Sequence, residues 1–242
     1  MPAVNPPTSA RELLAPNGEL HAAINIGNAV LAGGTIENPT GVTVDIAGEM
    51  ARLLDATPVF HAFVAAKDSF ASLISGESRL GFMAIEPVRA EKVAFTEPYV
   101  LIEGVYVVGV QSEASSPHEL DRPGIRIGVK EGSAYDLFLT RTLQHAELVR
   151  GAEGVDVYLD QGLDAGAGIR QPVDTFASQH EGQRVIAEAF MQIRQAVALP
   201  KEAPSEVVEW TDSVLDELKA SGFLSNALAA YGHTDVTVAP PR

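Results

Sequence analysis

The sequence contains no cysteine, and this absence removes several kinds of chemistry at once. Without a thiol the chain has no disulfide, no thiolate nucleophile and no cysteine-based metal site, although its compartment stays open. Basic residues are also scarce, because 17 Lys and Arg stand against 32 Asp and Glu and give a net charge of −15. A field of that sign repels phosphate backbones and anionic lipids, so we expect no nucleic-acid partner. A small anionic ligand remains compatible with it, because one well-placed Arg outweighs a distant, screened field.

Long apolar runs are missing as well. No stretch of about eighteen consecutive apolar residues occurs, so we expect no membrane insertion. The first segment, MPAVNPPTSARELLAPNG, lacks a basic region followed by an apolar one, and no signal peptide is visible in it. Two localisations therefore stay open: periplasmic if a signal peptide has been removed, and otherwise cytoplasmic.

The usual catalytic signatures are absent too. The sequence has no GxGxxG or Walker-type loop, so we expect no nucleotide cofactor. It has no HExxH motif, and its six His residues are scattered, so we expect no metal. No GxSxG elbow is present, and no residue is predicted as catalytic in the leading interpretation. These absences favour a binding protein.

The apolar positions that are present alternate between strand and helix patterns. Near the N-terminus, strands are expected at 20–27, 59–65 and 80–85, with helices at 44–54 and around 70–74 between them. This alternation predicts an α/β fold with an open, mainly parallel sheet. Further strands are expected at 103–110, 125–130, 148–151, 163–169, 184–190 and 195–200, and further helices at 133–143, 204–222 and 224–231. The tail VTVAPPR is expected to be loose.

The most informative stretch is AIEPVRAEKVAFTEPYV, residues 84–100. It resembles the family 3 extracellular solute-binding proteins, the polar amino-acid receptors of ABC importers. Their signature is a strand, a short turn ending in Arg, and then a hydrophobic-Phe-Ser/Thr-x-Pro-Tyr run. The matching residues here are Arg89, Phe95, Thr96, Pro98 and Tyr99. GVTVDIAGEMARLL, LISGESRLGFMAI, DRPGIRIGVKEGSAYDLFL and ELKASGFLSNALAAYG resemble further parts of the family in the same order.

The resemblance implies a two-lobed, type II periplasmic-binding-protein-like fold, in which each lobe is an open mixed sheet flanked by helices. Lobe 1 is expected to comprise 1–103 and 196–242, and lobe 2 to comprise 104–195. A small carboxylate-bearing ligand, an amino acid or organic acid, is expected in the interlobe cleft. The resemblance further implies a monomer whose ligand-closed form is recognised by an ABC permease.

Three positions suggest how a carboxylate is held. Arg89 offers a rigid fork of donors with a permanent charge, which suits bidentate capture of a carboxylate. Ser133 and Ala134 open a helix after a strand, so their free N–H groups and the Ser133 hydroxyl form an anion site, while Ser133 also serves as the N-cap. In the resembled family this loop faces the Arg. Ile85, just before the turn, is expected beside the ligand.

Two departures from the family concern the stacking of a ligand side chain and the binding of the ligand's ammonium group. The family places an aromatic residue after the first strand, whereas this chain has Asn28 there, which we predict to contact the ligand. The family also places an acidic residue a few positions after LDA, where this chain has Ile169 and then Arg170. Arg170 favours a second anionic group on the ligand, unless it points to solvent.

Glu86 is the third departure, because the family has Thr or Ser three residues before the Arg. A carboxylate there could receive an ammonium group, pair with Arg89, or act as a general acid/base if closure raises its pKa. The leading hypothesis is a solute-binding protein. The alternative is a cofactor-independent enzyme on the same scaffold, a dehydratase, lyase or isomerase of a small organic acid resembling cyclohexadienyl dehydratase, with Glu86 as the acid/base.

Overall fold

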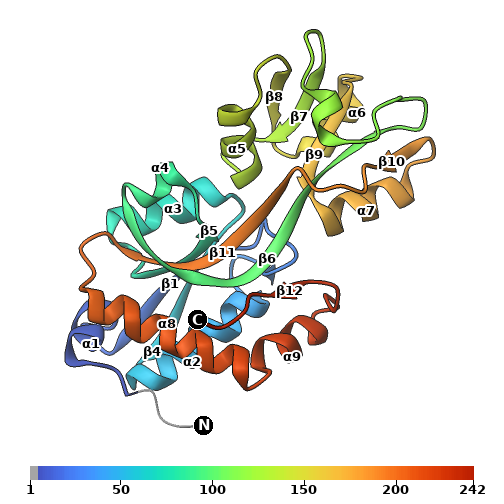
Figure 1. Ribbon diagram of the computed structural model, residues 1–242. Helices are drawn as coiled ribbons and strands as arrows, with labels where there is room; N and C mark the ends of the chain where they lie inside the picture. The colour runs from blue at the N-terminus through green and yellow to red at the C-terminus, as the bar shows by residue number, and fades with distance from the viewer. Residues whose placement is uncertain (1–4) are drawn as a thin grey trace. The chain divides into compact units, whose positions relative to one another are not determined.

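The computed structural model describes residues 5–242, which form two compact units (Figure 1). Unit 1 extends to Leu101 and resumes at Arg194–Arg242, whereas unit 2 is Ile102–Ile193. The first four residues of the segment searched for a signal peptide lie outside the described part of the chain.

The sheet of unit 1 has the order β4-β1-β5-β11-β6, and β12 pairs with β6. Its strands are β1 Glu19–Asn25, β4 Thr57–Phe63, β5 Leu80–Ala84, β6 Val93–Gly109, β11 Met191–Pro200 and β12 Thr237–Val238. β1 runs parallel to β4 and β5, while β11 is antiparallel to β5. All five residues of β5 are buried, as predicted for an uninterrupted apolar strand covered on both faces. A small hairpin joins β2 Gly33–Gly34 to β3 Pro39–Thr40.

Helices cover both faces of this sheet. They are α1 Thr8–Leu14, α2 Val42–Leu54, α3 Ala66–Ser75, α4 Pro87–Ala90, α8 Ser205–Ala220 and α9 Phe223–Ala230. α3 packs on β1, β4 and β5 from one side, and α1, α2, α8 and α9 gather on the other side (Figure 1). α2 buries Val42, Ile46 and Met50, whose spacing of four residues produces the predicted apolar face.

Unit 2 is built on the second half of β6, in the order β6-β9-β7-β8 with β10 pairing on β6. Its elements are the 3₁₀ helix η1 Pro117–Leu120, β7 Arg126–Lys130, α5 Ala134–Thr142, β8 Glu147–Gly151, α6 Gly154–Asp160, β9 Ala165–Ile169, α7 Arg170–Gln179 and β10 Gln183–Val185. β7 is parallel to β8 and β9. Val105, Val157 and Phe176 belong to one buried cluster that joins the sheet to α6 and α7.

Several sequence-based expectations were wrong or incomplete. α1, α6 and α7 were not predicted: α1 and α6 have only seven residues each, and α7 buries only Val173 and Phe176 and carries Pro172 in its first turn, where proline is tolerated. Residues 186–190 were predicted as part of a strand, but β10 ends at Val185. The tail is not loose, because Thr237 and Val238 pair with Leu101 and Val100 of β6.

Candidate ligand site

The predicted residues of unit 1 lie at one edge of its sheet. β1, β4 and β5 are parallel, so the loops that follow them leave from the same edge. Asn28 follows β1, while Ile85 and Glu86 follow β5 and lead into α4, which carries Arg89. In open α/β sheets ligands bind outside the carboxyl ends of the strands. The sequence therefore gathers these residues where a ligand is expected.

Arg89 and Glu86 are both buried, each with 3% of its surface exposed. Glu86 is the N-cap residue of α4, and Pro87 at the first helical position fixes the turn that brings Arg89 back toward the strand. Arg89 Nη1 donates to the carbonyl oxygen of Ala84 over 3.3 Å. Burial lowers the pKa of Arg89 to about 10, while the nearby Glu86 carboxylate opposes this shift. The guanidinium therefore remains charged at neutral pH, next to a carboxylate.

Ile85 and Asn28 complete this edge. The Ile85 N–H donates to Arg194 O over 2.9 Å, so the backbone continues the β5 pairing with β11 up to the turn. The Asn28 N–H donates to Asn25 O, which folds the chain into a turn after β1. The Asn28 side-chain oxygen is buried and has no hydrogen-bond partner among the described residues. Because an unsatisfied buried acceptor costs about 1–3 kcal/mol, a donor on a ligand would be stabilised there.

The predicted anion site of unit 2 also lies at the carboxyl ends of parallel strands. Ser133 follows β7 and is the N-cap of α5, as predicted, because its Oγ accepts from Asp136 N over 3.1 Å. Asp136, itself 4% exposed, accepts from Gly132 N over 2.9 Å and from Arg150 Nε over 3.0 Å. These bonds fix the loop so that Ala134 lies in the first turn of the helix, where N–H groups lack partners inside the helix.

Arg170 begins α7 directly after Ile169, at the end of β9. Its Nε donates to the Glu103 carboxylate, and its Nη2 donates to Ala187 O over 2.8 Å. The guanidinium is therefore already bound by two acceptors of its own unit. Its contact with a second anionic group of the ligand stays a prediction, and a ligand would have to compete with these acceptors.

The sequence analysis missed an ion pair at this edge of unit 2. Lys130, the last residue of β7, donates through Nζ to Glu153 Oε1 over 2.5 Å, and Glu153 follows the parallel neighbour β8. The side chain of Lys130 is 15% exposed and that of Glu153 is 48% exposed. The signal was the position of each residue at the end of a predicted strand, Lys130 as its last residue and Glu153 two residues beyond, because neighbouring parallel strands end at the same edge. Unit 2 thus has a partly exposed carboxylate at that edge, although Ile169 is not acidic.

Other types of site find less support in the described part of the chain. Among residues 5–242, no group of three or more His, Asp or Glu side chains is arranged to hold a metal ion. Within the same residues, none of the helices combines the length and the apolar character needed to cross a membrane.

Two α/β units, each a mixed sheet flanked by helices and joined through β6 and β11, are typical of the type II periplasmic-binding fold. The family model of bacterial extracellular solute-binding proteins, family 3, matches residues 32–234, and the chain belongs to this family. The resemblance inferred from residues 84–100 is thereby confirmed. The search of curated proteins gave no match.

Solved structures share this fold at low sequence identity. A variant of ArgBP from T. maritima superposes with a TM-score of 0.75 at 22% identity, covering 92% of this chain and 98% of that chain. A putative ABC transporter binding component from Wolinella succinogenes, complexed with lysine, gives a TM-score of 0.75 at 19% identity, covering 88% and 95%. The ancestral amino-acid-binding protein AncCDT-1, described as a precursor of cyclohexadienyl dehydratase, gives 0.75 at 18% identity, covering 93% and 99%.

Proposed function

We propose that this protein captures a small amino acid and delivers it to an ABC importer. The observation that carries the proposal is the buried pair of Arg89 and Glu86 at the carboxyl end of β5. An α-amino acid carries its carboxylate and its ammonium group on the same carbon atom, and the Arg89 guanidinium and the Glu86 carboxyl group complement these two groups in charge. Asn28 adds a buried acceptor at the same edge.

The interlobe cleft expected from the sequence belongs to this proposal, with the Ser133 loop as a second anchor for the carboxylate. Its support is the capped N-terminus of α5, where N–H groups and the helix dipole favour negative charge. Two proteins that share this fold, the lysine complex and the arginine-bound form of ArgBP, favour an amino acid over a dicarboxylate as the ligand. An ABC permease as partner, a monomeric state and a location outside the cytoplasm complete the proposal.

A thermal-shift screen tests this function. We expect one or a few L-amino acids to raise the melting temperature, because a ligand at 100 times its dissociation constant adds about 2.7 kcal/mol to the free energy of unfolding. The panel should include cationic, neutral and acidic amino acids together with matching keto acids and dicarboxylates. If only keto acids or dicarboxylates stabilise the protein, the amino-acid assignment is wrong, and if no member does, the binding function itself loses its support.

A second candidate function is catalysis on the bound acid, favoured by the buried carboxylate of Glu86. A carboxylate enclosed with a substrate can move a proton without a cofactor. Proton NMR of the stabilising ligand, incubated with the protein for hours, separates the two functions. A binding protein returns the ligand unchanged, whereas an enzyme converts it to a new compound.

Two substitutions of Ser133 separate its capping role from its proposed ligand contact. Ser133→Ala removes the bond to Asp136 N and is expected to lower the free energy of unfolding by about 1 kcal/mol. Ser133→Asp keeps an N-cap acceptor and should preserve stability, but its negative charge repels a carboxylate. Calorimetric titration should therefore show a larger loss of affinity for Ser133→Asp than for Ser133→Ala. The opposite order would contradict an anion site at this loop.

A further inference from the structure

Residues 236–242, which we call the strap, contact β6 at one end and α8 at the other. Thr237 and Val238 form β12 and pair with Leu101 and Val100 of β6. The N–H of Ala239 donates to Tyr99 O over 3.0 Å. Ala239 is 1% exposed, so the strap is also anchored by burial. The segment is therefore an added edge on β6.

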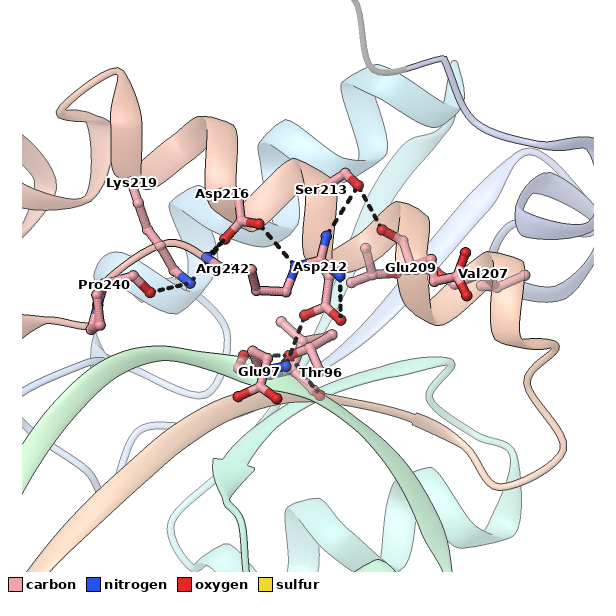
Figure 2. Close-up of polar contacts among 12 residues, drawn as sticks. Thr96, Glu97, Val207, Glu209, Asp212, Ser213, Asp216, Lys219, Pro240 and Arg242 are labelled. Carbon is pink, nitrogen blue, oxygen red and sulfur yellow. Dashed lines mark hydrogen bonds and ion pairs between the residues drawn. The ribbon is translucent and has the colours of Figure 1, made fainter.

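The far end of the strap is held by charges on α8 (Figure 2). Arg242 Nε donates to Asp216 Oδ2 over 2.9 Å, and Arg242 Nη1 lies 3.5 Å from Asp212 Oδ2. Lys219 Nζ donates to Pro240 O over 3.3 Å and to Asp216 Oδ1 over 3.3 Å. Figure 2 shows these side chains along one face of α8, with Thr96 and Glu97 of β6 below them.

Asp212 connects the strap to β6 a second time. While Oδ2 faces Arg242, Oδ1 accepts from the Glu97 N–H over 2.8 Å. The β6 ladder is irregular here, because Val197 N donates to the Thr96 side-chain oxygen over 3.0 Å and Pro98 has no N–H. Besides β11, with which β6 pairs, the partners of residues 97–101 are Asp212 and the strap. A segment that relies on such contacts at its edge becomes less ordered when they are lost.

We propose that the strap detaches reversibly from β6 and α8, that it holds residues 97–101 of β6 in place while it is bound, and that it thereby sets the ligand affinity of the protein. Through these residues the chain passes from unit 1 into unit 2, and they follow closely after α4, which carries Arg89. Release removes the pairing of β12 and frees the Arg242 ion pairs, so β6 samples more conformations. The ligand-binding conformation is then less populated, and the apparent affinity falls with that population.

The contacts of the strap are weak enough to allow it to detach and bind again. The Arg242 side chain is 40% exposed, while Asp216 and Asp212 are 24% and 10% exposed, so salt can screen the ion pairs. β12 has only two residues, which limits the backbone bonds that hold it. The buried Ala239 gives the closed form a defined position.

Hydrogen exchange of the ligand-free protein tests whether the strap holds residues 97–101 in place. In Arg242→Ala, and in a variant lacking residues 237–242, we expect the amides of residues 97–101 to exchange at least about tenfold faster than in the wild type, as a locally opened segment does. High salt should increase the exchange rate of the same amides in the wild type, because it screens the ion pairs of Arg242. Arg52→Ala is the matched control, because it removes a surface ion pair to Glu49 on α2, away from β6. Unchanged exchange in both strap variants overturns the proposal.

Calorimetry then tests the effect on the ligand, which rests on the proposed function. With the amino acid that most stabilises the wild type, the strap variants should bind about three- to tenfold more weakly and Arg52→Ala unchanged. Faster exchange with unchanged affinity overturns the regulatory role. If the wild type binds no amino acid, the proposed function is wrong, while the exchange result still shows whether the strap holds residues 97–101 in place. If the deletion variant does not fold, Arg242→Ala and the salt series carry both tests.

Discussion

Replacing Arg89 with Ala is expected to weaken amino-acid binding by at least about a hundredfold. Removal of a bidentate, charge-assisted contact from a buried position costs more than an ordinary hydrogen bond, and a hundredfold corresponds to about 2.8 kcal/mol. The substitution also leaves the Glu86 carboxylate, which is 3% exposed, without the Arg89 charge. Calorimetric titration with the ligand found in the thermal-shift screen measures the loss.

Two further variants test whether the loss of affinity depends on the guanidinium group of Arg89. Arg89→Lys keeps the positive charge but loses the planar fork, so we expect an affinity between those of Arg89→Ala and the wild type. Arg52→Ala removes an exposed Arg of α2 and should bind as the wild type does. Circular dichroism must show that each variant is folded. An unchanged dissociation constant in folded Arg89→Ala would falsify the assignment of Arg89 to the ligand carboxylate.

Gly154→Ala is expected to lower the free energy of unfolding by about 3 kcal/mol. A Cβ at Gly154 would lie 2.3 Å from Ala167 O and 2.9 Å from Gly128 O. Both neighbours are backbone atoms of the central strands, which cannot rotate away as a side chain can. α6 must therefore move off the sheet and disturb the cluster around Val157, and overpacking of this kind typically costs 1–3 kcal/mol.

The matched control is Gly48→Ala, in the middle of α2. A Cβ at Gly48 meets nothing within 4 Å, and alanine is a better helix former than glycine by about 1 kcal/mol. Urea denaturation should show Gly154→Ala destabilised and Gly48→Ala unchanged or more stable. Equal stability of the two variants would mean that α6 does not pack against the strands as closely as described.

The strand pattern was predictable because it depends on local apolar runs. β1, β5 and β7 appear within two residues of their expected ends, since each run is bounded by polar or glycine-rich segments. The helices α6 and α7 were not predictable from periodicity, because the seven residues of α6 make about two turns and α7 buries only Val173 and Phe176, which are too few apolar positions to define a face. The strap escaped prediction because its two-residue strand is stabilised by a partner more than a hundred residues away.

The candidate site was predictable in part. The turn that carries Arg89 and the cap at Ser133 follow from local motifs, so the sequence indicates both. Sequence cannot give the burial of Glu86 or the acceptors that bind Arg170, because both depend on tertiary packing. The lack of a hydrogen-bond partner for the buried side-chain oxygen of Asn28 can likewise be seen only when its surroundings are known.

The central claim is that the protein grips the carboxylate of an amino acid through Arg89. Its most direct test is calorimetric titration of the wild type with the best amino-acid ligand and with the amide of that same amino acid. The amide keeps the side chain and the ammonium group but has no negative charge. We expect the amide to bind at least about a hundredfold more weakly than the amino acid, and most of this difference to disappear in Arg89→Ala. Equal binding of the two compounds to the wild type would contradict it.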